Sequence, residues 1–211
     1  MMTCLAWVTL AAAILTVSLP VIASPVLLTL QATDFDDLAV IGPATALTSS
    51  HYNYNGVFTG DVFSQAFARS DGSYLYLYQG DNDGPSVLEA LAVAPFYTIS
   101  QAGWLSDHEP TGFLGGGVTP AGATYDVAAP LPYVSFNYPS FLAANVPAGE
   151  HTRVLYLISP NGPTLGEAYL IDSGVAVVTV VTTVPEPASL SLILGGVTLL
   201  ASRRARRRRQ E

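Results

Sequence analysis

Short runs of aromatic and β-branched residues, each closed by glycine, proline, asparagine or aspartate, fill the chain between residues 24 and 183. The clearest run is Tyr-Leu-Tyr-Leu-Tyr at residues 74–78, which has turn-forming residues on both sides. Such runs favour a pleated, half-buried surface, and no sustained helical period occurs between the two ends of the chain. The pattern predicts an all-β fold, an antiparallel β-sandwich of about seven to ten strands with jelly-roll or immunoglobulin-like topology.

Two hairpins are expected in this domain. The first joins residues 57–68 to residues 74–78 through Ser-Asp-Gly-Ser, and the last joins residues 168–171 to residues 175–183. Single strands are expected at residues 87–96, 133–136 and 153–159. Glycine and proline are frequent in residues 103–132, which are expected to form long loops with at most short strands around Tyr125 and Val127.

The N-terminal end has the pattern of a signal peptide. An apolar segment at residues 5–19 is followed by Pro20 and then by Val-Ile-Ala, in which the small Ala23 marks the cleavage site. We expect the export machinery to translocate this end and signal peptidase to remove residues 1–23. No lysine or arginine precedes the apolar segment, so only the amino terminus supplies positive charge, and a retained membrane helix is the alternative.

The C-terminal end consists of three parts in a fixed order. Pro185, Glu186 and Pro187 hold the backbone extended, because proline lacks an N–H group and disfavours a helix before it. An apolar run at residues 188–201 predicts a short transmembrane helix, since only a helix satisfies such a backbone in lipid. At about 1.5 Å per residue it spans about 21 Å of the roughly 30 Å hydrocarbon layer, a marginal span that suits temporary retention in the inner membrane. The cytoplasmic stop-transfer residues are the arginines that follow: Arg203, Arg204, Arg206, Arg207, Arg208 and Arg209.

This ending resembles the PEP-CTERM sorting signal of diderm bacteria, with the Pro-Glu-Pro core intact at Pro185, Glu186 and Pro187. The resemblance is specific to residues 184–211. It implies an exosortase as processing partner, cleavage near the motif, and release or transfer of the protein to the cell envelope or its surface polymer. An ordinary C-terminal membrane anchor is the alternative. The expected organisation is therefore a signal peptide (1–23), an exported domain (24–183) and a sorting signal (184–211).

Charge and cysteine content limit what the exported domain does. Its only cations are Arg69 and Arg153, whereas acidic residues occur throughout, so nucleic acid is not an expected partner. The one cysteine, Cys4, lies in the segment expected to be removed. The mature domain is therefore expected to have no disulfide, no thiolate nucleophile and no cysteine metal site. A domain of this length buries enough surface to fold without disulfide bonds.

Residues with catalytic or metal-binding chemistry are few. Asp107, His108 and Glu109 are adjacent, but neighbouring side chains on an extended chain point to opposite faces, so we interpret them as a solvated loop. Residues 81–84, Asp-Asn-Asp-Gly, resemble the start of a calcium loop, but position 92 is alanine where the bidentate glutamate belongs, so a turn is favoured. Residues 34, 36 and 37 form an acidic cluster that we interpret as a solvated strand edge. No metal and no cofactor are expected.

Aromatic residues in or near expected loops are the remaining candidates for binding. Trp104, Tyr52 and Tyr54 are possible sugar contacts, because flat aromatic faces stack on sugar rings, and Tyr133 and Tyr138 belong to the same group. Core filling is the favoured interpretation for any single one of them. The sequence therefore predicts a non-enzymatic exported protein with a structural or adhesive role in the envelope or extracellular matrix. A module that binds extracellular polysaccharide is the alternative, and a secreted hydrolase built on Asp107, His108 and Glu109 is less favoured.

Overall fold

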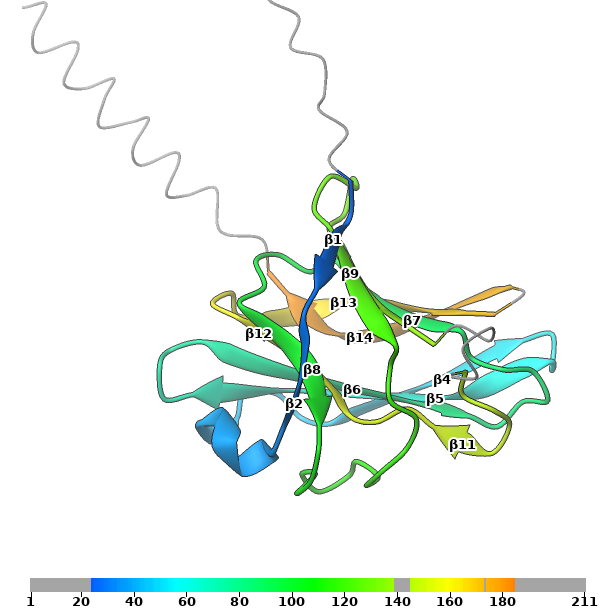
Figure 1. Cartoon of the computed structure of the whole chain (residues 1–211), viewed down its shortest axis with the longest axis horizontal. Helices are drawn as coiled ribbons and strands as arrows, with labels where there is room; N and C mark the ends of the chain where they lie inside the picture. The colour runs from blue at the N-terminus through cyan, green and yellow to red at the C-terminus, as the bar shows by residue number, and fades with distance from the viewer. Residues whose placement is uncertain (1–23, 139–144, 173, 185–211) are drawn as a thin grey trace, which may run out of the picture.

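The computed structural model describes residues 24–138, 145–172 and 174–184, and these form a two-layered all-β domain (Figure 1). The predicted signal peptide, the Pro-Glu-Pro motif, the predicted transmembrane helix and the arginine tail lie outside the described residues. In the part of the chain that is described, no helix combines the length and the hydropathy that a membrane crossing requires. The one short helix among these residues is the 3-10 turn η1, Phe35–Leu38.

One layer, sheet A, has six strands in the order β1-β9-β10-β7-β13-β14. All of its neighbouring strands pair antiparallel. Its longest pairing is the hairpin of β13 and β14, which extends the predicted hairpin back to Pro163. The strands are β1 (Val26–Leu28), β7 (Ala90–Ala94), β9 (Gly122–Asp126), β10 (Tyr133–Asn137), β13 (Pro163–Ile171) and β14 (Val175–Thr183).

The other layer, sheet B, has the order β2-β8-β12-β6-β5-β3, with β4 paired to β5 and β11 paired to β6. Its centre is the predicted hairpin of β5 and β6, and its edge strand β2 runs parallel to β8. Because β1 and β2 follow each other directly, the start of the domain supplies an edge strand to each sheet. The strands are β2 (Leu30–Thr33), β3 (Val40–Pro43), β4 (Thr48–Tyr54), β5 (Phe58–Arg69), β6 (Tyr74–Asn82), β8 (Gln101–Leu105), β11 (Glu150–His151) and β12 (Leu155–Ser159).

The main core lies between the two sheets. Alternate residues of β6, β7, β10 and β14 point into it, including the fully buried Tyr78, Leu91 and Phe136. Burial of this apolar surface is the principal stabilising contribution. A second buried cluster, which includes Leu38 and Phe113, covers the outer face of sheet B with η1 and the loop after β8. No comparable cluster covers the outer face of sheet A among the described residues, so part of that face is open to solvent.

Side chains of sheet B satisfy the free backbone groups at the edge of sheet A. In an antiparallel ladder the N–H and C=O groups of one residue point to the same side, and those of Val181 point away from β13. The Val181 N–H group donates to Ser64 Oγ at 3.0 Å, and the Tyr78 hydroxyl donates to the Val181 carbonyl at 2.6 Å. The Ser50 hydroxyl donates to the Thr179 carbonyl at 2.6 Å. These three hydrogen bonds join the layers and leave this part of the edge paired.

The structure confirms the all-β class and both hairpins and is consistent with a β-sandwich, but the expected number of strands is wrong. Strands β1 to β14 are present in the described residues. The additional strands, such as β2, β3 and β11, are only two to four residues long, so they carry no readable alternation and exist through pairing. Residues 101–105 form strand β8 at the start of the region expected to be loops. The parallel pairing of β2 with β8 was not expected in an antiparallel sandwich.

Candidate functional site

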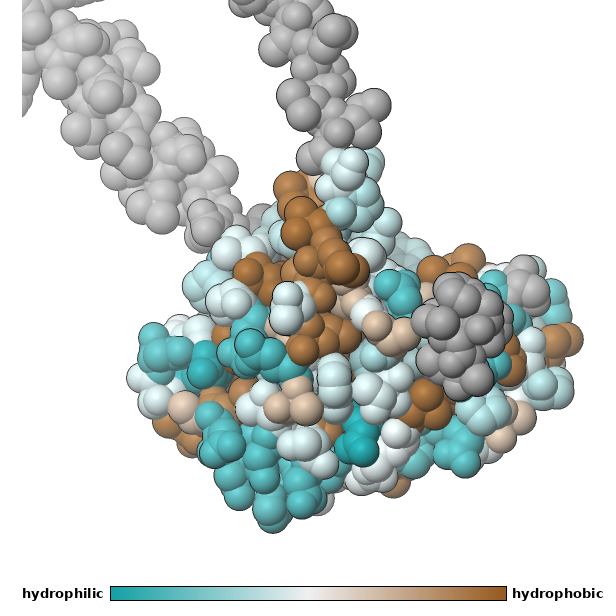
Figure 2. All heavy atoms as spheres, viewed as in Figure 1, coloured by the Kyte–Doolittle hydropathy of each residue, from teal (hydrophilic) through white to brown (hydrophobic). Residues whose placement is uncertain are grey.

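Trp104 lies in a strand and not in a loop. It belongs to β8, between Ala32 of β2 and Leu155 of β12, and its partly exposed side chain packs against the main core. It also lines a hollow of about 280 Å³ at the edge of the sandwich, together with Leu27, Leu28, Leu30, Pro120, Ala121 and Gly122. Figure 2 shows hydrophobic side chains gathered over β1, beside this edge. Trp104 therefore combines a structural contact with access to an apolar hollow.

The two tyrosines of β4 have opposite environments. Tyr52 is only 2% exposed, packs on Phe58 with a centroid distance of 4.9 Å, and donates a hydrogen bond to the Asp81 carbonyl at 2.6 Å. Burial raises the pKa of its hydroxyl, which stays protonated as a donor. Tyr52 thus fills the core, which is the favoured interpretation of these aromatic residues, and its ring is not accessible as a sugar contact. Tyr54 is 42% exposed at the end of the strand, where a partner has access to its ring. Tyr138 is also fully buried.

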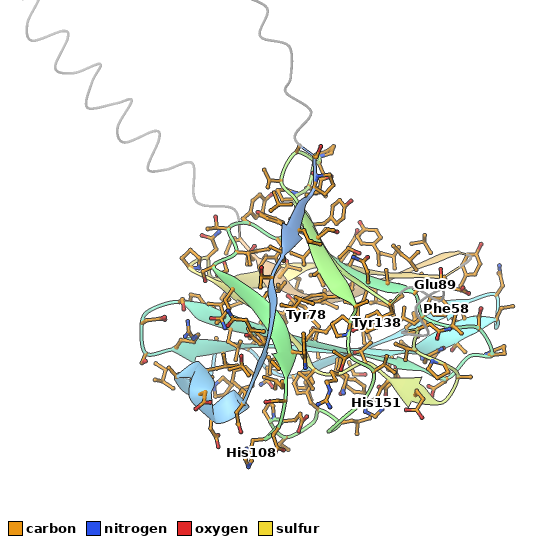
Figure 3. The ribbon with its side chains drawn as sticks, viewed as in Figure 1. Phe58, Tyr78, Glu89, His108, Tyr138 and His151 are labelled. Carbon is orange, nitrogen blue, oxygen red and sulfur yellow. The ribbon has the colours of Figure 1, made fainter. Side chains whose placement is uncertain are left out.

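Asp107, His108 and Glu109 do not converge. His108 Nδ1 lies 2.8 Å from Asp34 Oδ2 across the loop, whereas Asp107 accepts a hydrogen bond from the backbone N–H group of His108. The Glu109 carboxylate lies near Gly115. Figure 3 shows His108 at the tip of the domain, on the loop after β8. The three residues thus form no shared cleft of the kind that the hydrolase hypothesis requires.

Electrostatics explain the ion pair between Asp34 and His108. The hydrogen bond to Asp34 raises the pKa of the imidazole, and the same bond lowers the pKa of the carboxyl. Asp34 also accepts from the N–H group of Asp36, which caps η1. One ligand atom from each of Asp34, Asp36 and His108 lies within 4.8 Å of the others, so these residues could hold a cation. Since Asp34 already caps a helix and pairs with His108, the contacts present serve the loop.

The acidic run at residues 81–84 is the end of β6 and the turn that follows. The Asn82 side chain is buried and donates to the carbonyls of Ser86 and Val146, so it fixes the turn. The N–H groups of Asp83 and Gly84 both donate to the Thr59 carbonyl. Burial raises the pKa of the half-buried Asp81. These contacts agree with the predicted turn.

A groove on the outer face of sheet A was missed by the sequence analysis. It has a volume of about 600 Å³ and passes over β7, between β13 and the loop that joins β9 to β10. Its lining residues come from four strands and that loop: Ala92, Ala94, Thr124, Ala129, Pro130, Leu131, Tyr133, Ser135, Asn137, Tyr169 and Ile171. The available signal was the alternation of alanine at positions 90, 92 and 94, which places small residues along one face of a strand.

Comparison with known proteins identifies the C-terminal end. Residues 183–209 match the family model described as the PEP-CTERM protein-sorting motif. No curated protein and no solved structure matches the chain. The match confirms the resemblance seen at Pro185, Glu186 and Pro187, although the role of each of these residues remains a prediction. The chain therefore carries a PEP-CTERM sorting motif, which marks it as an exported protein with a membrane-anchored tail that an exosortase processes.

Proposed function

We propose that this protein has a structural or adhesive role in the cell envelope or extracellular matrix, and that it is not an enzyme. The observation that carries the proposal is a sorting motif that follows the two-layered β domain directly, since the matched residues 183–209 begin at the last residue of β14. A sandwich held together by its core and by hydrogen bonds between its layers suits a load-bearing or adhesive part of the cell surface. The domain is acidic, which keeps it away from anionic surfaces and leaves neutral polymers and cations as partners.

The test is a comparison of cells that lack the protein with cells that carry the full chain. An adhesive role predicts that the full chain restores the amount of polymer retained on washed cells, whereas a chain ending at Val184 is secreted and restores much less. Equal polymer retention and equal cell cohesion in all three strains would contradict the proposal.

Binding of extracellular polysaccharide through Trp104 and Tyr54 is the alternative function. The hollow beside Trp104 favours it, because an indole face next to an opening can stack on a sugar ring. Trp104→Ala should then reduce retention on polysaccharide, and Tyr54→Ala should reduce it further. If both variants are retained like the parent chain, this alternative is wrong. The hydrolase hypothesis is disfavoured by the separation of Asp107, His108 and Glu109, and release of reducing ends from a polysaccharide would revive it.

A further inference from the structure

The groove over β7 is built by the register of four adjacent strands. Tyr169 of β13 pairs with Ala92 of β7, Ala92 pairs with Ser135 of β10, and Ser135 pairs with Thr124 of β9. All four side chains point away from the core, so the large side chain of Tyr169 lies beside a row of smaller side chains. Ala92 and Ala94 are each only 5% exposed although they face outward, because their neighbours overhang them.

Two tyrosines lie on opposite sides of Ala92 and Ala94, which form the floor of the groove. Val134 of β10 pairs with Val93 of β7. The next pair along these two antiparallel strands would be Tyr133 and Ala94, so Tyr133 lies beside Ala94. Strand geometry puts the Cα atoms of Tyr133 and Tyr169 about 12 Å apart, with β7 between them. The Tyr169 hydroxyl donates to Glu167 Oε2 at 2.5 Å, which fixes the position of its ring. The groove therefore has two aromatic walls and a small-residue floor.

The strand order excludes a peptide that would bind by adding a strand to β7. Strand β7 pairs with β10 on one side and with β13 on the other, so both of its edges are occupied. A peptide cannot be added to it as a further strand and would have to bind through side chains alone. The lining supplies hydroxyl and amide groups from Thr124, Ser135 and Asn137 between apolar surfaces, which is the mixture found in ligand sites.

The charged residues near the groove exclude anionic chains as ligands. None of the lining residues is charged, and the nearest row of the sheet carries Glu167 beside Ala94 and Asp126 beside Tyr133. Carboxylates at one end repel an anionic chain, whereas they accept hydrogen bonds from hydroxyl groups. An uncharged, hydroxyl-rich chain thus fits the aromatic walls, the polar floor and the acidic end together.

We propose that this groove binds a neutral polysaccharide chain, with sugar rings against Tyr133 and Tyr169 and hydroxyl groups bonded to Ser135, Asn137 and Glu167. The inference rests on the proposed adhesive function and gives it a binding site. The groove holds the chain without cleaving it. The Cα atoms of Glu167 and Asp126 are three strand spacings apart, which is about 14 Å. Glycoside hydrolysis uses two carboxyl groups that are separated by only about 5 to 10 Å.

The test measures binding of the full chain in a detergent without a sugar head group. Cellulose, xylan, mannan and dextran are the neutral probes, and polygalacturonate is the anionic one. We expect retention on at least one neutral polymer and none on polygalacturonate. Tyr169→Ala should weaken that binding about tenfold, as expected for one lost stacking contact, and Tyr169→Phe should keep most of it. Ala92→Leu places a larger side chain on the floor of the groove and should abolish binding.

The matched control is Leu165→Ala, on the same strand and the same face but outside the groove, where Leu165 is 66% exposed. Unchanged melting temperatures show that the variants are folded. The groove assignment is overturned if no neutral polymer binds, if the anionic polymer binds better, or if Leu165→Ala weakens binding as much as Tyr169→Ala. Loss of binding in Trp104→Ala alone would move the site to the hollow at the sandwich edge. A chain that is processed and reaches the envelope but binds no polymer contradicts the groove alone, and a chain that binds but has no adhesive effect contradicts the proposed function alone.

Discussion

The hydrogen bond from Tyr78 to the Val181 carbonyl should carry a measurable share of the stability of the sandwich. Tyr78 is fully buried in β6, and burial raises the pKa of its hydroxyl, so it remains a donor. Tyr78→Phe keeps the ring and its packing but leaves the Val181 carbonyl without this donor at the edge of sheet A. Loss of one buried hydrogen bond with its acceptor left unpaired costs about 1.5 kcal/mol.

A second buried tyrosine provides the matched control. The Tyr138 hydroxyl lies beside Thr152 and makes at most a weak hydrogen bond with it among the described residues. Tyr138→Phe removes a buried polar group without breaking a well-formed hydrogen bond, so the free energy of unfolding should change by less than about 0.5 kcal/mol or should increase. The two variants delete the same atom from equally buried rings, and a short hydrogen bond to a backbone carbonyl is present only at Tyr78.

Thermal unfolding followed by near-ultraviolet circular dichroism measures the difference. For a domain of this size, 1.5 kcal/mol lowers the melting temperature by about 3 to 6 °C. We expect this loss for Tyr78→Phe and almost none for Tyr138→Phe. Equal melting temperatures for the two variants would show that the bond between the layers does not stabilise the sandwich, and a larger loss for Tyr138→Phe would reverse the reasoning.

Three further predictions follow from the loops, the strand contacts and the sorting motif. The ion pair of Asp34 and His108 requires a charged imidazole and a charged carboxylate. Its stabilisation should be fully present between the usual carboxyl pKa of 3.8 and the usual histidine pKa of 6.5. It should be lost as pH rises through the raised pKa of His108 or falls through the lowered pKa of Asp34. The melting temperature of His108→Gln should therefore differ most from that of the parent chain at about pH 5 and converge with it in alkaline buffer. Gly103→Ala should cost about 1 to 3 kcal/mol in denaturant unfolding, because its Cβ would lie 2.0 Å from the Gln31 carbonyl oxygen in the parallel strand pair. Gly122→Ala, with open space around its Cβ, should be neutral. Glu186→Ala should leave the chain unprocessed in the inner membrane, whereas Glu211→Ala at the last residue should be processed normally; equal processing of both would refute the role of the motif.

The long strands could be predicted from the sequence because their patterns are local. The run at residues 74–78 and the β-branched run at residues 175–183 carry enough apolar residues to specify strands without knowledge of their partners. Strand β2 could not be predicted in this way. Its four residues acquire their structure by pairing with β8 across roughly seventy positions of sequence, and no local pattern records that pairing.

The binding surface was harder to predict than the fold. Tyr52 and Tyr54 are two positions apart in one strand, yet the first is buried and the second is exposed because the strand reaches the end of the sheet. Tyr169 shows no special pattern in the sequence. Its importance arises because the register places it beside Ala92, and the register depends on contacts far away in the chain. Aromatic residues can be counted from a sequence, but only the paired sheet shows which of them flank a groove.

The central claim is that an exosortase processes this chain during its export, and intact-mass measurement tests it most directly. The protein is recovered separately from the inner membrane, the outer envelope and the medium. We predict that the inner-membrane form retains Arg203 to Arg209 and that the outer or released form ends near Pro185 to Ala188. A chain that extends to Glu211 in the outer envelope or the medium would contradict the account.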